Sequence, residues 1–230
     1  MILAGGIGRR LRPLTYVLPK PMIPVGDKPL LEHQIEYFKR HSIRKFVIAT
    51  GYLGKIIEDY FEDGARWNVE IKYARGNRPL GTAGQLKTAE PFINGTFVAI
   101  NGDIIISVDL RKMIAFHQKS EAFSTIALRP FRTRVPYGII KLREENRIES
   151  WQEKPEIDLI MNVGLYVLER EVFCLIPADH VASLERETFP MMINKGYKLL
   201  GFISDTEYFD VTDMNALEKV NNRFFDRPMP

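Results

Sequence analysis

Short apolar runs alternate with amphipathic stretches through the first 135 residues of the chain. The runs are rich in Val, Ile, Ala and Phe, which is typical of buried strands, and the stretches between them repeat with helical spacing. Strand, helix and strand in this order predict parallel βαβ units with helices on both faces of one sheet. We predict strands at 45–50, 69–74, 96–100 and 123–128, and helices at 56–61, 84–93 and 110–119.

Beyond residue 136 the pattern changes to strands with fewer helices, at 137–142, 147–152 and 162–168. No linker rich in Pro, Gly or Ser separates the halves, so we predict a single domain over 1–230, with one lobe over 1–135 and a second over 136–230. The predicted fold class is α/β, a Rossmann-like mixed and mostly parallel sheet flanked by helices. No six-residue repeat is present near the C-terminus, so no β-helical extension is expected, and 223–230 is expected to be a helix fraying into a tail.

Composition and charge narrow the possible functions. The 230 residues carry a formal net charge of +3 with dispersed basic residues, which argues against a nucleic-acid partner. No apolar run approaches the ~18 residues of a membrane-spanning helix, so no membrane partner is expected and a cytoplasmic protein is the default expectation. The single cysteine, Cys174, lies in the apolar run 172–176 and is expected to be a buried core thiol rather than a nucleophile.

A glycine-rich segment near the N-terminus carries the most chemical information. Gly5, Gly6 and Gly8 fall within four positions, which allows the backbone to turn tightly and present N–H groups to an oxyanion. Arg10 follows closely and offers a fork-shaped donor for phosphate. Taken alone, the segment is also compatible with a dinucleotide-binding turn or a tight structural turn. However, Pro13 makes a continuous helix after the glycines unlikely to form, which disfavours the dinucleotide interpretation.

Two prolines surround one lysine a little further along, in Pro19-Lys20-Pro21. Because proline restricts the backbone, the direction of the lysine side chain is fixed. We therefore interpret Lys20 as a phosphate ligand in preference to a solvated charge.

The two segments together, Leu3-Ala4-Gly5-Gly6-x-Gly8-x-Arg10-Leu11-x-Pro13-Leu14-Thr15 and Pro19-Lys20-Pro21-Met22, resemble the signature of the sugar-1-phosphate nucleotidyltransferases, also called NDP-sugar pyrophosphorylases. The resemblance extends through nearly the whole chain and is to a short form of the family, nearest to mannose-1-phosphate guanylyltransferases. It implies that a nucleoside triphosphate and a sugar 1-phosphate are the partners, and that Arg10 and Lys20 bind the triphosphate. The implied cradle consists of Leu3, Ala4, Gly5, Gly6 and Gly8.

Two aspartates are candidates for binding Mg²⁺, which prefers oxygen ligands. Asp103 follows the strand at 96–100, at the end of a sheet where α/β proteins bind ligands, although Asn101-Gly102-Asp103 is also compatible with a plain turn. The resemblance implies that Asp103 and Asp210 are the metal ligands. The family's Gly-Thr-Pro after the second aspartate is replaced here by Thr212-Asp213-Met214, and we expect Thr212 or Asp213 to cap a helix that starts at Met214.

The remaining site residues follow from the resemblance. Gly81, Thr82 and Gln85 match the element that contacts the nucleobase, although Gly81-Thr82 is equally compatible with a turn and helix cap. The residues implied to bind the sugar phosphate lie in the second lobe. For Glu185, an acidic first turn of a helix is the alternative role. The implied sugar-phosphate ligands are Tyr137, Gly138, Glu153, Lys154, Asn162 and Glu185.

The sequence thus predicts an enzyme that transfers a nucleoside monophosphate to a sugar 1-phosphate, with GTP and mannose 1-phosphate or a manno-heptose 1-phosphate as first choice. Uridylyl or thymidylyl transfer to glucose 1-phosphate, a non-sugar phosphate acceptor, a non-catalytic regulatory homologue and a dinucleotide-dependent oxidoreductase are the alternatives. The sequence is compatible with a homo-oligomer. Only Met1 and Ile2 precede the glycine segment, so we expect about three further residues upstream, because a central strand is usually longer.

Overall fold

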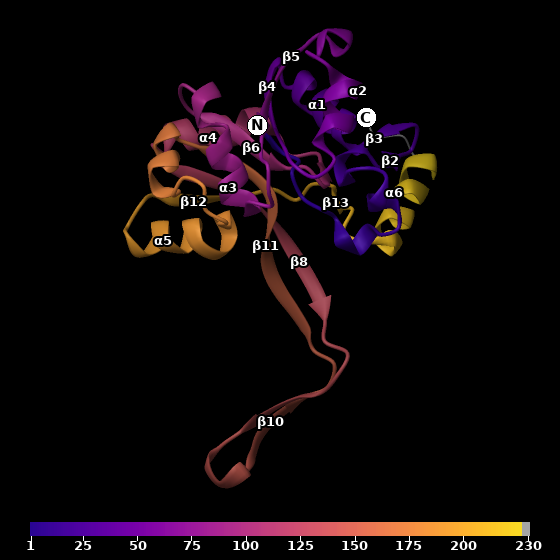
Figure 1. Ribbon diagram of the computed structural model, residues 1–230. Helices are drawn as coiled ribbons and strands as arrows, with labels where there is room; N and C mark the ends of the chain where they lie inside the picture. Colours follow the sequence, from indigo (N-terminus) through magenta and orange to yellow (C-terminus); the bar gives the residue numbers. More distant parts are fainter. Residues whose placement is uncertain (227–230) are drawn as a thin grey trace.

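The computed structural model describes residues 1–226, which form a seven-stranded sheet flanked by helices (Figure 1). The strand order is β12-β8-β11-β6-β1-β4-β5. Strand β1 pairs in parallel with β4 and β6, β4 with β5, and β12 with β8, whereas β11 is antiparallel to both of its neighbours. The strands are β1 (Ile2–Leu3), β4 (Lys45–Thr50), β5 (Glu70–Arg75), β6 (Phe97–Asn101), β8 (Ser124–Arg134), β11 (Glu156–Leu168) and β12 (Leu199–Ile203).

Helices cover both faces of this sheet because successive strand residues point to opposite sides. Ile2 and Ile48 pack into one core with helices α1, α2 and α4, and Leu3 and Ala49 pack into a second core with α3 and α5. A third, smaller core lies beneath α6. The predicted α/β class with a mixed, mostly parallel sheet is therefore confirmed. The helices are α1 (Leu30–Arg40), α2 (Gly54–Phe61), α3 (Gly81–Thr88), α4 (Leu110–Lys119), α5 (Phe189–Asn194) and α6 (Met214–Asp226).

Three short antiparallel pairs lie outside the central sheet in residues 1–226, and two of them belong to the body. Strands β2 (Pro24–Val25) and β3 (Lys28–Pro29) form one, and β7 (Ile104–Ile106) and β13 (Tyr208–Asp210) form the other. The second pair is important for the site, because it brings a segment from near the C-terminus to the end of β6.

Most elements predicted in the first half lie close to their predicted positions, but helix α1 was not predicted and one predicted helix has other bounds. The helix predicted over 84–93 begins at Gly81 and ends at Thr88, and a 3₁₀ turn follows over Glu90–Phe92. Pro91 explains the early end, because proline lacks the N–H that a continuing helix needs. None of the helices within residues 1–226 is long and apolar enough to cross a bilayer.

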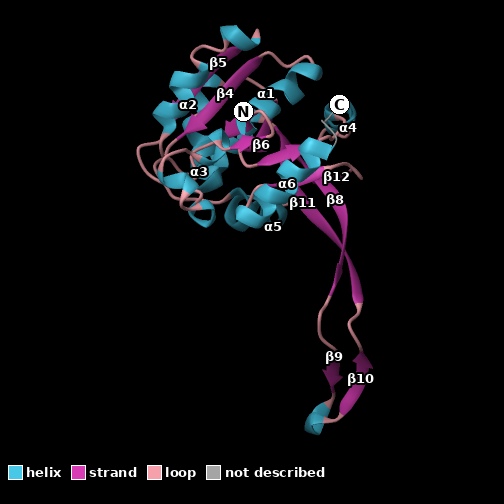
Figure 2. Ribbon diagram, turned by 90° about the vertical axis from the view of Figure 1, so that its right-hand side faces the viewer, coloured by secondary structure: helices cyan, strands magenta, loops and turns pink. Residues whose placement is uncertain are grey.

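The second half of the chain differs more from the prediction. Strands β8 and β11 were predicted to be short, but they continue beyond the sheet as a two-stranded ribbon and end in the hairpin β9 (Ile139–Leu142) and β10 (Ile148–Gln152). Residues 129–161, here called the arm, project from the body in both views (Figures 1 and 2). The predicted division into lobes at residue 135 falls within this arm, and strands from both halves share the central sheet.

The prediction for Cys174 is wrong, because its side chain is exposed. The apolar run around it forms a 3₁₀ helix over Arg170–Leu175, which turns Val172 and Phe173 into the core and Cys174 outward. The predicted C-terminal tail beyond residue 226 lies outside the described residues. Met1 is half-buried, its ammonium donates to the carbonyl of Val98 at 2.6 Å, and burial lowers the pKa of that ammonium to about 5. The expectation of further residues upstream stays a prediction.

The core position of β4 gives a stability prediction. Ile48 is fully buried between β1 and β5, so Ile48→Ala should lower the free energy of unfolding by about 2–5 kcal/mol through lost burial and a residual cavity. Ile203→Ala is the matched control, because Ile203 is 59% exposed on the edge strand β12, and its effect should stay within about 0.5 kcal/mol. Equal losses in urea denaturation of the two variants would contradict the assigned core.

Candidate functional site

The glycine segment forms a loop directly after β1 and is held from two sides. The backbone N–H of Gly5 donates to Oε1 of Gln85 on α3 at 2.7 Å, and the hydroxyl of Thr15 donates to the carbonyl of Gly8 at 3.0 Å. Gly8 has a φ of +66°, and a Cβ there would lie 3.2 Å from Cβ of Lys20, so glycine is required for this close approach. Gly6 is exposed, and no described atom lies within 4 Å of the position that its Cβ would occupy. The loop is thus fixed in shape while Gly6 leaves room for a ligand.

Lys20 and Asp103, predicted separately, form an ion pair in the structure. Nζ of Lys20 lies 2.6 Å from Oδ2 of Asp103, and the side chains are 10% and 34% exposed. Lys20 begins a 3₁₀ turn after Pro19, and Asp103 lies in the turn between β6 and β7. Burying an ammonium is costly unless it is paired, and Asp103 supplies the partner. The pair joins the glycine-loop region to the carboxyl end of the central sheet.

Asp210 reaches the same place through β13. The pairing of β13 with β7 sets Asp210 opposite Ile104, and the N–H of Val211 donates to the carbonyl of Asp103 at 3.0 Å. Within the described residues, Oδ1 of Asp210 is buried and has no hydrogen-bond partner. Burial raises the pKa of Asp210, and the nearby charge of Asp103 raises it further, against a lowering effect of Lys20 and Arg10. The carboxylate is therefore poised to gain from a cation.

The loop after Asp210 departs from the family pattern but keeps a clear structural role. Oδ1 of Asp213 accepts from the backbone N–H of Ala216 at 2.9 Å, at the start of α6. This is the side-chain cap expected of Thr212 or Asp213, and the residue that provides it is Asp213.

The donor set at Asp103 and Asp210 fits a divalent cation with oxygen ligands. Two carboxylates converge there and one of their oxygens is buried without a partner, which is costly without a cation. No group of three or more His, Cys, Asp or Glu side chains that could enclose a metal occurs in residues 1–226. The arrangement therefore suits an ion such as Mg²⁺, which commonly takes one or two carboxylates and completes its shell with water and phosphate oxygens.

Two adjoining cavities, of about 150 Å³ and 270 Å³, lie around the ion pair and share Gly6, Lys20 and Asp103. The first extends from the loop to α3, and the second extends toward the arginines. Nine sequence-predicted residues therefore line one continuous region. They are Leu3, Ala4, Gly6, Gly8, Arg10, Lys20, Thr82, Gln85 and Asp103.

The α3 side of this region is built by close backbone contacts. Gly81 has a φ of +71°, and a Cβ there would overlap the carbonyl of Ala182. Thr82 does not cap the helix: its hydroxyl donates to Oε2 of Glu185 at 2.7 Å and accepts from the N–H of Leu184 at 2.8 Å. The side-chain carbonyl of Gln85 accepts the hydrogen bond from Gly5, so the side-chain NH₂ group of Gln85 remains available for other contacts.

Asn162 and Glu185 lie on the body and meet at Tyr166. The Tyr166 hydroxyl donates to Oε1 of Glu185 at 3.0 Å and accepts from Nδ2 of Asn162 at 3.0 Å. Burial, followed by the charge of Glu185, raises the pKa of Tyr166. Glu185 lies in a π-helical turn over Leu184–Thr188 and also accepts from Ser183 at 2.8 Å. Because Glu185 also accepts a hydrogen bond from Thr82 on α3, its role is not limited to that of an acidic residue in the first turn of a helix.

The other four predicted sugar-phosphate residues lie on the arm, away from the glycine loop (Figures 1 and 2). They are close to one another: a Cβ on Gly138 would lie 2.9 Å from Oε2 of Glu153 and 3.1 Å from Nε1 of Trp151. Tyr137 is 74% exposed, and Lys154 is exposed with a φ of +44°. The structure therefore brings only Asn162 and Glu185 of the six predicted sugar-phosphate residues together on the body. The cause is the ribbon of β8 and β11, which holds Tyr137, Gly138, Glu153 and Lys154 at its far end.

Sequence reasoning missed Gln34, which holds the turn that carries Asp103. Nε2 of Gln34 donates to the carbonyls of Asn101 and Ile104, both at 2.8 Å, and the residue is 2% exposed. The available signal was a polar residue on the apolar face of the helix at 30–40, where Leu31 and Ile35 are also buried. Arg9, which lines the cavity beside Arg10, was missed as well.

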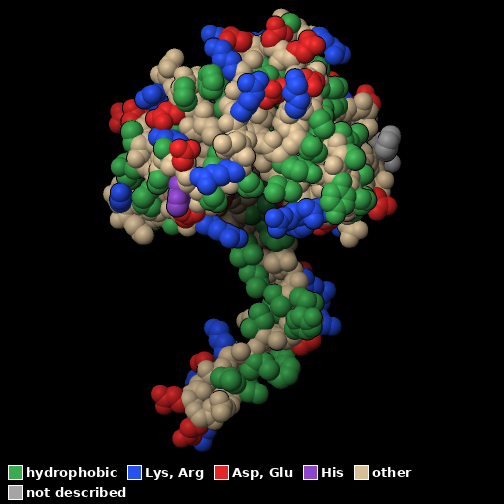
Figure 3. Space-filling model, viewed as in Figure 1, with side chains coloured by type: hydrophobic (Ala, Val, Ile, Leu, Met, Phe, Trp, Pro, Cys, Tyr) green, Lys and Arg blue, Asp and Glu red, His purple; other side chains and the backbone are tan. Residues whose placement is uncertain are grey.

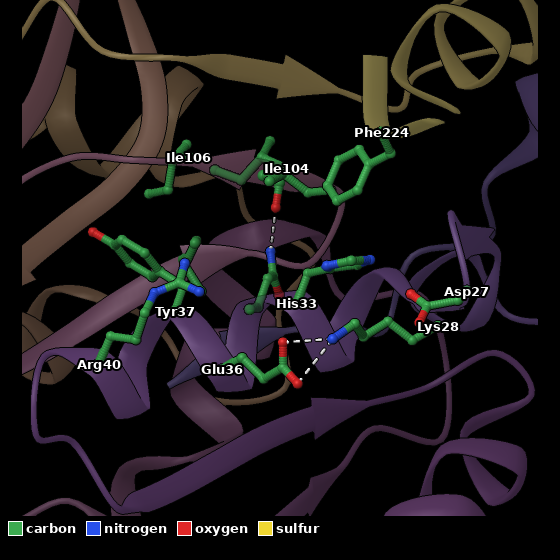
Figure 4. A pocket seen from close by; sticks show the side chains of 12 residues that line it. Asp27, Lys28, His33, Glu36, Tyr37, Arg40, Ile104, Ile106 and Phe224 are labelled. Atoms are coloured by element: carbon green, nitrogen blue, oxygen red, sulfur yellow. Dashed lines mark hydrogen bonds and ion pairs between the residues drawn. The ribbon is translucent and has the colours of Figure 1, made fainter. Parts of the chain in front are cut away.

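Behind this turn, on the α1 side, lies another pocket of about 210 Å³ (Figure 4). Ile104, Ile106 and Phe224 line one side, and an ion pair between Lys28 and Glu36, at 2.8 Å, lies on the other. The sequence-predicted site residues do not line it. It is therefore separate from the cleft at the glycine loop.

The raised pKa of Asp210 gives a prediction for the metal-free protein. A carboxyl group with a raised folded-state pKa stabilises the fold below its unfolded pKa of about 4, and this contribution is lost as pH rises through the folded value. The isosteric Asp210→Asn variant should therefore melt at a higher temperature than the unsubstituted protein at pH 7 in chelator, and the difference should shrink toward pH 4.

The control for this experiment is Asp59→Asn, which removes an exposed carboxylate paired with Lys55 on α2. Its effect on the melting temperature should be small at every pH, because exposed ion pairs contribute little. An Asp210→Asn variant less stable than the unsubstituted protein at pH 7 in chelator would show that Asp210 has a favourable partner.

Comparison with known proteins identifies the family. A model of the nucleotidyl transferase family matches residues 1–227. The UTP–glucose-1-phosphate uridylyltransferase of Synechocystis is 34% identical over 92% of this chain and 59% of its own length. The D-glycero-α-D-manno-heptose 1-phosphate guanylyltransferase of Aneurinibacillus thermoaerophilus is also 34% identical, over 92% of this chain and 91% of its own length. Further relatives include mannose-1-phosphate guanylyltransferases. This chain covers 60% of the length of the one from Mycobacterium tuberculosis. The chain thus spans about three fifths of the length of some relatives.

Solved structures agree with this result. HddC from Yersinia pseudotuberculosis, solved in complex with GMP-PN, superposes with a TM-score of 0.77 at 25% identity, with 97% of both chains covered. The family resemblance predicted from the glycine loop and Lys20 is confirmed, and this chain belongs to the nucleotidyl transferase family.

Proposed function

We propose that this protein transfers a nucleoside monophosphate from a nucleoside triphosphate to a sugar 1-phosphate and releases pyrophosphate. The observation that carries the proposal is the convergence of Lys20, Asp103 and Asp210 beside the glycine loop, at the carboxyl end of the central sheet. A phosphate-binding loop, a fixed cation and two carboxylates suit the joining of two anionic phosphates, which needs charge neutralisation and positioning more than proton transfer.

The reaction is a displacement at the α-phosphorus of the triphosphate. A phosphate oxygen of the sugar 1-phosphate forms the new bond to this phosphorus, and the bond to the β-phosphate bridging oxygen breaks, so that pyrophosphate leaves with its electron pair. Backbone N–H groups of the glycine loop, with Arg9, Arg10 and Lys20, bind the triphosphate and stabilise the leaving charge. Mg²⁺, when held by Asp103 and Asp210, supplies further neutralisation of phosphate charge.

Charge balance explains how Lys20 can serve this reaction. Its ammonium is already paired with Asp103. A cation held by Asp103 would weaken the attraction between Lys20 and Asp103, which would leave the ammonium free to bind a phosphate oxygen. We infer that Lys20 moves little, because Pro19 and Pro21 hold its backbone and it lies close to Gly8.

GTP with mannose 1-phosphate or a manno-heptose 1-phosphate is our first choice of substrates. The support is the match over nearly the full length of heptose 1-phosphate guanylyltransferases, at 91% and 93%. Uridylyl transfer to glucose 1-phosphate is the second candidate, favoured by the 34% identity to the Synechocystis uridylyltransferase. A matrix of nucleoside triphosphates against sugar 1-phosphates, assayed by pyrophosphate release, separates the two, and a blank matrix would favour a non-catalytic homologue.

Removing either member of the central pair should abolish most of the turnover. Asp103→Asn and Lys20→Met should each lower kcat about 100- to 1,000-fold, because each removes a charge that neutralises the phosphates. Lys55→Met is the control, since the Lys55 side chain is 79% exposed on α2 and should leave kcat unchanged. Pyrophosphate release near the unsubstituted rate from Asp103→Asn would contradict the assigned site.

Gln34 should act on the reaction through Asp103. Gln34→Leu keeps the volume but removes both hydrogen bonds to the turn, so kcat should fall about 10- to 100-fold, and the Mg²⁺ concentration for half-maximal rate should rise. The control is Gln118→Leu, because Gln118 is exposed on α4. A lower rate with an unchanged Mg²⁺ requirement would mean that Gln34 has only a structural role.

A further inference from the structure

We propose that two copies of this chain exchange their arms, so that the arm of one copy completes the sugar-phosphate half of the partner's cleft. This inference rests on the proposed function. It starts from a division of the site: the groups suited to the triphosphate lie together on the body, whereas Tyr137, Gly138, Glu153 and Lys154 lie together midway along the arm, between the β8–β11 ribbon and the β9–β10 hairpin.

The cluster on the arm is already assembled, which indicates a binding role. Nε1 of Trp151 donates to Oε2 of Glu153 at 3.3 Å, and a Cβ on Gly138 would displace both side-chain ends, which lie 3.1 Å and 2.9 Å from its position. Lys154 is a non-glycine residue with a positive φ of +44°, an unfavourable conformation that is often retained at functional positions. An exposed ammonium beside a carboxylate suits a sugar phosphate, since one can bind the phosphate and the other the hydroxyls.

The backbone pairing within the arm opposes movement of this cluster to the cleft of the same chain. Beyond the sheet, β8 and β11 pair from Arg129 opposite Met161 to Arg134 opposite Glu156, and the N–H of Val135 extends the ladder to the carbonyl of Pro155 at 3.0 Å. Folding the tip back would break part of this ladder, and each lost backbone hydrogen bond costs stability. A second copy can receive the tip with the ladder intact.

The exposed strand edges and apolar side chains of the arm also favour a protein partner. Within the described residues, 129–134 and 156–161 pair only with each other, so both ribbon edges and faces are open. Isolated two-stranded ribbons are marginally stable in water, and open strand edges tend to be covered. Large apolar side chains on the arm are between 49% and 74% exposed: Tyr137, Leu142, Ile148, Trp151, Leu159 and Ile160.

The combined apolar surface of these six side chains favours a second copy of the chain as a stable, symmetric partner. Six such side chains present roughly 600 Å² of apolar surface, close to the approximately 800 Å² that each partner buries in a typical stable interface. A second copy carries the same arm, so a two-fold dimer covers both arms at once and completes both clefts. Figure 3 shows the green apolar side chains along the arm and the blue basic side chains on the body near its base.

Complementation between two inactive variants tests the exchange. Asp103→Asn inactivates the body half, and Lys154→Ala, at an exposed position, inactivates the arm half. Each variant alone should be strongly impaired. In a mixed dimer one cleft combines an intact body with an intact arm, so an equimolar mixture should regain about a quarter of the unsubstituted activity, because half of the dimers are mixed and half of their clefts are intact.

Three outcomes overturn the proposal when the unsubstituted protein is active. The first is no gain in activity from mixed dimers isolated with two affinity tags. The second is full activity of Lys154→Ala alone. The third is an active monomer in light scattering at assay concentration.

The oligomeric state is a readout that does not depend on activity, so it separates failure of this inference from failure of the proposed function. The double variant Leu159→Lys with Ile160→Lys should convert a dimer to a monomer in light scattering, whereas Ile193→Lys, at a position 63% exposed on α5, should remain dimeric. If every substrate pair fails, the proposed function falls, but a dimer sensitive to the arm substitutions still supports exchange. A monomer in the unsubstituted protein overturns it.

Discussion

The ion pair between Lys20 and Asp103 determines much of the site's geometry, because it links two elements that are distant in sequence within a largely buried cleft. A buried ammonium without a partner would be strongly destabilising, so the segment from Gly8 to Lys20 is held against the end of β6 by an electrostatic requirement. Tyr52 adds a second tie, since its hydroxyl donates to the carbonyl of Thr15 at 2.8 Å. Contacts within the chain therefore fix the shape of the glycine loop.

The second carboxylate, that of Asp210, lies in an unfavourable environment, in contrast to the paired carboxylate of Asp103. Asp210 is pushed toward its protonated form by burial and by Asp103, and one of its oxygens is buried without a partner in the described part of the chain. The short pairing of β13 with β7 and the hydrogen bond from Val211 hold it there nonetheless. The fold thus accepts a local cost at the place where a cation would relieve it, which is a common property of functional sites.

The sequence was sufficient for the elements whose pattern depends on local periodicity, and insufficient where tertiary packing decides. The strand at 45–50 and the helix at 110–119 lie where predicted, because each buries a full apolar face. Asp103 was a candidate from its place after a strand and became a predicted metal ligand through the resemblance, whereas Asp210 was predicted only through the resemblance, because β13 is short and pairs outside the main sheet. Gln34 was missed although it is a polar residue on an apolar helix face, because that position indicates burial but not which backbone carbonyls the side chain bonds. Cys174 was placed wrongly because a 3₁₀ turn changes which residues of an apolar run face inward.

The arm shows the same limit most clearly. Alternating side chains at 129–134 and 156–161 look the same whether a strand lies in a sheet or in a free ribbon, so the sequence could not separate the two. Its consequence is chemical as well as structural. Because the charges proposed to bind phosphate are fixed on the body and Glu153 and Lys154 lie on the arm, the position of the proposed sugar site depends on what the arm packs against. In that arrangement, substitutions in the arm can change the choice of sugar without disturbing Lys20, Asp103 or the glycine loop, because no packing in the body's cores depends on the arm tip.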